Sequence, residues 1–156
     1  MLRLVRRFLV IVALMFWQGG FTFYAAIVVP IGMDELGSHT AQGFITRRVA
    51  PFINLAGLIA LAPLIADVLC TRGDRPWRTR LRWAMLFALS VTLATLLWLY
   101  PRMNALLEPT SRSVLERSAF GPLHQTYLIV STVQWAFALG YLWLTLNAWR
   151  QEDGGR

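Results

Sequence analysis

Four long apolar segments separated by charged stretches dominate this sequence. We predict membrane-spanning helices over residues of about 8–31, 49–69, 82–101 and 124–149, within a single membrane domain covering residues 1–156. Each segment can cross a ~30 Å hydrocarbon core, because about 20 helical residues rising ~1.5 Å each cover that distance. The start, Met1 to Arg7, resembles that of a signal peptide. The uncharged run behind it continues to Met33, so we expect it to be retained as the first helix.

The fourth segment carries a regular polar face. Between Ser118 and Trp149 there is no Asp, Glu, Lys or Arg. Polar or small residues recur there at spacings of three and four, which places them on one face of a helix. They are His124, Tyr127, Ser131, Gln134, Ala138, Tyr141 and Thr145. A polar face cannot contact lipid, so other helices must cover it. We therefore predict an all-α integral membrane four-helix bundle in up-down-up-down order, in which the deep part of this face serves packing.

The first two helices carry weaker signs of a packing face. In the first, we predict that Gln18, Thr22, Ala25 and Val29 lie on one side. The adjacent Gly19-Gly20 either allows a neighbouring helix to approach closely or marks a kink. In the second, Ala56 and Ala60 form a small-xxx-small pair suited to helix contact.

The stretches between the spans predict three loops and a tail, and the middle loop, Thr71 to Arg82, carries five arginines. Ile31 to Arg48 is expected to be the first loop and the entry to the second helix, with Pro51 in the first turn of that helix. In the third loop, Ser113 to Glu116 fits a capping box and predicts a short helical turn at the membrane interface. Gly121-Pro122 is expected to break the chain before His124. Residues 150–156 are predicted to be a mobile polar tail.

Asp67 lies near the end of the second span, where two interpretations are open. A buried acid in a membrane helix would indicate a functional site. Its place at the end of the span favours a position at the interface, where it meets one of the following arginines. The single cysteine, Cys70, excludes an intramolecular disulfide.

Composition and charge narrow the class of protein. Apolar residues make up 56% of the chain, mean hydropathy is +0.51 and the net charge is +7. All fifteen basic residues are arginines, and they gather at the ends of apolar runs rather than in a basic stripe, which argues against nucleic acid as a partner. Ten lie on the side of the termini and the middle loop, and five lie on the other. The positive-inside rule then places both termini in the cytoplasm, in a plasma (inner) membrane.

Candidate chemistry gathers on the outer side of the predicted bundle. The polar residues there are His39, Gln42, Arg47, Arg48, Asn54, Asn104, Glu108, His124 and Tyr127. We take His39, Gln42, Arg47, Asn54, Asn104, His124 and Tyr127 as a tentative ligand site. His39 and His124, with a nearby carboxylate, are a weak candidate for a transition-metal site, because they lie on different segments without a ligand spacing. No other cofactor is predicted.

Two hypotheses follow for function. In the first, the outer polar face binds a small ligand, a metal ion or a partner. In the second, the chain is an accessory or structural subunit of a larger membrane complex, or a homo-oligomer in the bilayer, with no ligand site of its own. No phosphate-binding loop or hydrolase motif occurs, so we expect no enzymatic activity and no catalytic residues.

The pattern also resembles a known family. The chain resembles the transmembrane-protein-205-like family in its four membrane helices and in a glycine-containing first helix that ends near Pro30. Further points of likeness are Gln42-Gly43, Asn104, and Arg117 followed by Phe120, Leu123 and His124. The likeness extends over roughly residues 17–149. It implies a small four-helix membrane bundle, distantly similar to copper-resistance-type membrane domains, and a special place for His124. A serine is common in that family three residues after the histidine, where this chain has Tyr127.

Overall fold

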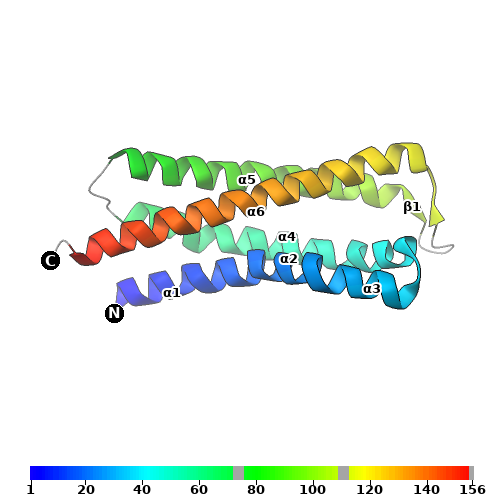
Figure 1. Cartoon of the computed structure of the whole chain (residues 1–156). Helices are drawn as coiled ribbons and strands as arrows, with labels where there is room; N and C mark the ends of the chain where they lie inside the picture. The colour runs from blue at the N-terminus through cyan, green and yellow to red at the C-terminus, as the bar shows by residue number, and fades with distance from the viewer. Residues whose placement is uncertain (72–75, 109–112, 155–156) are drawn as a thin grey trace.

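The computed structural model describes residues 1–71, 76–108 and 113–154, and shows an all-α bundle of four long helices (Figure 1). All four are long and apolar enough to cross a membrane, which confirms the predicted fold class. The first helix, Leu2–Leu36, comprises α1 (Leu2–Leu14), η1 (Met15–Gly19), α2 (Gly20–Phe23), η2 (Tyr24–Val28) and α3 (Val29–Leu36). The other three are α4 (His39–Cys70), α5 (Pro76–Ala105) and α6 (Arg117–Gly154). Two short strands, β1 (Leu107–Glu108) and β2 (Ser113–Val114), pair antiparallel.

Successive helices run in opposite directions, so both chain termini lie at the same end of the bundle (Figure 1). We call this the terminal end. The opposite end, with the connection from α3 to α4 and the β1–β2 pair, is the turn end. α5 packs most extensively against α6, and α4 packs against both α1 and α5.

Two π-helical turns interrupt the first helix. At η1 and η2 the hydrogen bonds widen to i→i+5, and each such turn shifts every following residue around the helix axis. The regular period that predicted a face of Gln18, Thr22, Ala25 and Val29 therefore does not hold. Gln18 is buried and the Thr22 hydroxyl accepts a hydrogen bond from the Trp135 indole N–H of α6 at 3.0 Å, but Ala25 is exposed, so the predicted face holds only in part. Gly19 and Gly20 are exposed without a helix packed on them, so the close-approach interpretation fails as well.

The connection from α3 to α4 is only Gly37 and Ser38, which corrects the predicted loop over Ile31 to Arg48. Gly37 has φ +57°, the left-handed conformation that ends a helix at low cost for glycine. The Ser38 side chain then accepts a hydrogen bond from the Ala41 backbone N–H at 3.3 Å and caps α4. Since α4 begins at His39, Pro51 lies inside the helix rather than in its first turn.

The segment before α6 is extended rather than helical. Ser113–Val114 forms β2, with Val114 opposite Leu107, and α6 begins only at Arg117. The predicted capping box and interfacial helical turn were therefore wrong. Pro122 lies within α6, so the expected break before His124 is also absent.

The core forms where the polar face of α6 meets the other helices. Ser131, Gln134, Ala138, Tyr141 and Thr145 are all buried, as the spacing predicted. Leucines of α4 and α5 surround them, with Trp17 from the first helix. Trp17 lies directly on Gly57, and a Cβ added to that glycine would be 2.6 Å from the indole ring. The close helix approach in this bundle thus lies at Gly57, beside the predicted Ala56 and Ala60 pair.

The last turns of α6 belong to the bundle. We expected a mobile tail from Arg150, but the helix continues to Gly154. Its Glu152 and Asp153 side chains contact Arg6 and Arg7 of α1. These ion pairs attach the end of the chain to α1. The predicted mobile tail was therefore wrong for the part of residues 150–156 that the structure describes. Residues 155–156 lie outside it.

Candidate functional site

The predicted outer residues lie at the turn end, where most of them bind one another across helices. The Arg47 guanidinium of α4 donates to the side-chain oxygen of Asn104 on α5. Tyr100 of α5 donates its hydroxyl to the Arg47 backbone carbonyl at 2.9 Å. Asn54 of α4 and Tyr127 of α6 lie 3.3 Å apart, from the amide nitrogen to the hydroxyl oxygen. Four of the seven candidate residues are thus used in contacts that hold α4, α5 and α6 together.

Gln42 joins α4 to the first helix instead. Its side chain is buried and its amide nitrogen lies 3.4 Å from the Tyr24 hydroxyl, which in turn is 2.9 Å from the Thr46 hydroxyl. The side-chain oxygen Oε1 of Gln42 lies so close to Gly32 that a Cβ added to this glycine would be 2.0 Å from it. A side chain at Gly32 would therefore force the Gln42 amide group to move.

The two histidines have different surroundings. His39 is exposed as the first residue of α4, and not in a loop as predicted. His124 is half-buried and its ring stacks on Phe120, with the centroids 5.6 Å apart and the planes 10° from parallel. Its Nδ1 is buried and has no hydrogen-bond partner in the described part of the chain. Among the described residues there is also no group of three or more His, Cys, Asp or Glu able to hold a metal ion.

The most highly charged site lies at the other end of the bundle, around Asp67. Its carboxylate is completely buried, which corrects the interfacial position that we predicted, but it does meet one of the following arginines, Arg82, as predicted. Arg82 of α5 donates from Nη2 to Oδ2 at 2.5 Å, and Arg6 of α1 places Nε 2.8 Å from Oδ1. Trp149 of α6 donates its indole N–H to Oδ1 at 3.0 Å, and Thr71 donates its hydroxyl to the same oxygen at 3.1 Å. One carboxylate therefore connects all four helices.

Arg82 is the second buried charge of this site, with only 1% of its surface exposed. Its Nε donates to the Thr145 hydroxyl at 3.3 Å, and its guanidinium lies 6.0 Å from the centre of the Tyr141 ring. Tyr141 itself donates to the backbone carbonyl of Leu64 at 2.9 Å. The polar face of α6 thus continues directly into the ion network. Its last members orient the arginine that neutralises Asp67.

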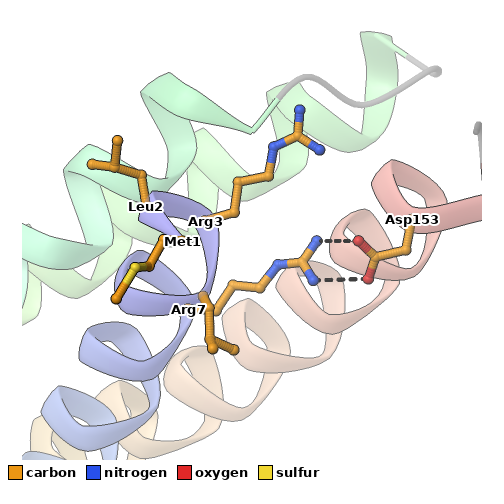
Figure 2. Close-up of a pocket in the computed structure, with 6 residues that line it drawn as sticks. Met1, Leu2, Arg3, Arg7 and Asp153 are labelled. Carbon is orange, nitrogen blue, oxygen red and sulfur yellow. Dashed lines mark hydrogen bonds and ion pairs between the residues drawn. The ribbon is translucent and has the colours of Figure 1, made fainter.

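A second layer of ion pairs closes the terminal end. Arg6 donates to Glu152 at 3.1 Å, and Arg7 reaches Glu152 at 3.0 Å. Arg7 also meets both carboxylate oxygens of Asp153, at 2.7 and 2.9 Å, in the parallel arrangement drawn in Figure 2. Such bidentate contacts are among the stronger charge-assisted hydrogen bonds. Together they fasten the start of α1 to the end of α6.

Buried charges of this kind persist in an apolar surrounding only when they are paired and hydrogen-bonded. Asp67 accepts hydrogen bonds from three donors, Thr71, Arg82 and Trp149, and forms an ion pair with Arg6, while Arg82 has both an acid and a hydroxyl acceptor. Such a site can fix the positions of four helices relative to one another.

Our sequence reasoning missed the central role of this network, although a signal was present. Trp149 follows Thr145 by four residues, so one further step of the predicted face of α6 reaches it. On α4, the buried Ala60, Leu64 and Asp67 follow the same spacing of three and four. Extending both faces to the end of each helix places Asp67 and Trp149 on the buried side.

The fold and the buried ion network define a four-helix integral membrane protein. A scan against protein-family models found no match, and neither the search of curated proteins nor that of solved structures found one. The resemblance to the transmembrane-protein-205-like family therefore stays a prediction.

Proposed function

We propose that this protein is a structural or accessory subunit of a larger membrane assembly, and not an enzyme. The observation that carries the proposal is the use of the predicted ligand residues. Arg47, Asn54, Asn104 and Tyr127 hydrogen-bond across helices, and Gln42 binds the first helix. Most of the predicted ligand residues at the turn end are thus engaged in contacts within the chain. The large apolar side chains that face outward are left to contact lipid or another membrane helix.

Photo-crosslinking tests this proposal. Each helix has a strongly exposed aromatic residue that can be replaced by a benzophenone-bearing amino acid. We choose Phe16, Phe52, Phe87 and Trp143. We expect one or two of these positions to crosslink to a single polypeptide in native membranes, because a partner covers only one side of the bundle. Crosslinking to lipid alone at all four positions would contradict the proposal. The buried Leu89 is the matched control and should give no intermolecular product.

A second candidate function is ligand binding at the turn end, and the unpartnered Nδ1 of His124 favours it. This candidate predicts that the purified protein binds Zn²⁺ or Cu²⁺ and that His124→Ala weakens the affinity at least about tenfold, which is ~1.4 kcal/mol. His39→Ala tests whether the two histidines share the ion, as predicted from the sequence. Isothermal titration calorimetry measures both. If the wild-type protein binds neither ion, the hypothesis of a metal site at the turn end is wrong.

We also propose that the terminal end faces the cytoplasm, in a plasma (inner) membrane. The sequence at this end carries ten arginines and four acids, compared with five arginines and four acids at the turn end. Such a bias favours the cytoplasmic side. In a Cys70→Ser background, Asp34→Cys should react with an impermeant thiol reagent applied to intact cells, whereas Gly73→Cys should not. Labelling of Gly73→Cys instead would reverse the orientation.

A further inference from the structure

The terminal end contains a hollow that the ion network leaves open. Its volume is about 480 Å³, within the range of small-ligand sites, and it lies between the start of α1 and the end of α6 (Figure 2). The side chains that line it are Met1, Leu2, Arg3, Leu4, Arg7 and Asp153. Three of them are apolar and three are charged. The hollow therefore presents both kinds of surface where the bundle meets the edge of the membrane.

The two arginines that line the hollow differ in how many of their guanidinium nitrogens are paired with acids. Arg7 pairs with Glu152 and Asp153, and its guanidinium lies 5.4 Å from the centre of the Trp149 ring. Within the part of the chain that the structure describes, Arg3 forms one ion pair, from Nε to Glu152 at 3.5 Å, and its side chain is 50% exposed. Among the described residues nothing pairs with its two terminal nitrogens. Arg3 therefore presents a free planar pair of N–H donors, the arrangement that binds phosphate oxygens.

The apolar side of the hollow indicates what the phosphate is attached to. Leu2 and Leu4 are the direct sequence neighbours of Arg3, and they are 89% and 73% exposed. Exposed leucines beside arginines are unfavourable in water but are favoured where acyl chains begin below a layer of headgroups. The excess of arginine at this end also attracts anions.

We propose that this hollow binds an anionic phospholipid. Arg3 contacts the phosphate, and Leu2 and Leu4 contact the first carbons of an acyl chain. Arg7 remains with Asp153 and forms the back of the site. The site does not depend on a protein partner, so it stands or falls separately from the proposed accessory function.

Native mass spectrometry of the purified full-length protein tests the site. Phosphatidylglycerol and phosphatidylcholine with the same acyl chains are titrated separately, and inorganic phosphate is used as a competitor. We expect phosphatidylglycerol to bind preferentially and Arg3→Gln to weaken its first binding step about tenfold. Leu4→Ser should weaken the same step, because it removes apolar contact with the acyl chain. Unchanged melting temperatures should show that both variants fold.

Two matched controls distinguish a built site from general attraction. Arg80→Gln removes an exposed charge from the same end but outside the hollow, and Arg48→Gln removes one from the turn end. Both should change the affinity less than twofold. Equal losses for Arg3→Gln and Arg80→Gln would overturn the proposal in favour of diffuse electrostatics. Competition by inorganic phosphate at the concentration where the lipid binds would also overturn it and assign the hollow to a free anion.

Discussion

Asp67→Asn is expected to destabilise the folded bundle by about 3–5 kcal/mol, the largest effect that we predict for a single substitution. The asparagine keeps the shape of the side chain and its one oxygen acceptor, but it removes the negative charge. Arg82, which is buried, and Arg6 then lose their shared counter-ion. Titration with SDS in mixed micelles, followed by circular dichroism, measures the free energy of unfolding.

Asp34→Asn provides the matched control for Asp67→Asn. Asp34 is exposed on α3 at the turn end, so its substitution should change stability by less than about 0.5 kcal/mol. The double variant Asp67→Asn/Arg82→Gln should recover part of the loss, since it removes the orphaned charge as well. A stability loss for Asp67→Asn no larger than that for Asp34→Asn would mean that the network does not hold the helices.

Gly57→Ala should destabilise the bundle by about 1–3 kcal/mol, through overpacking. The new Cβ would lie 2.6 Å from the Trp17 ring, and Trp17 is itself fully enclosed by the core. A rigid indole cannot move aside without shifting the first helix relative to α4. The same SDS titration measures the effect.

Gly43→Ala is the control for this substitution, on the same helix. A Cβ at Gly43 meets nothing within 4 Å, so alanine should be neutral or stabilise by about 0.5–1 kcal/mol through helix propensity. Replacing Trp17 by Phe in the Gly57→Ala background should restore part of the lost stability by making space. The packing argument fails when Gly57→Ala and Gly43→Ala have the same effect.

The sequence alone predicted the four helices and the buried face of α6 correctly. Both depend on local properties of the chain. A helix needs only a sufficiently long apolar run, and the buried face follows from the fixed angle between successive residues. Ser131, Gln134, Ala138, Tyr141 and Thr145 are accordingly all buried. The same rule failed for Ala25, because two π-helical turns change that angle in the first helix.

Local signals in the sequence also determine where helices end, although our predictions used only some of these signals. Gly37 followed by Ser38 combines a residue that ends one helix with a residue that caps the next. This pair alone is sufficient to place the turn, and the long loop predicted over residues 31–48 overlooked it. The capping box at Ser113 to Glu116 had the right residue types, but pairing of Val114 with Leu107 gave that segment an extended conformation.

Only the tertiary structure decided where the charges lie and what they do. Arg6, Asp67, Arg82 and Trp149 are each near one end of a different helix, and no spacing along the chain relates them. Their meeting depends on how the four helices pack, and packing in turn determines that Asp67 is buried rather than interfacial. The same is true of the hollow between α1 and α6, since it forms only where two distant ends of the chain come together. A charge near the end of a membrane helix can face either water or protein, and only its neighbours in space determine which.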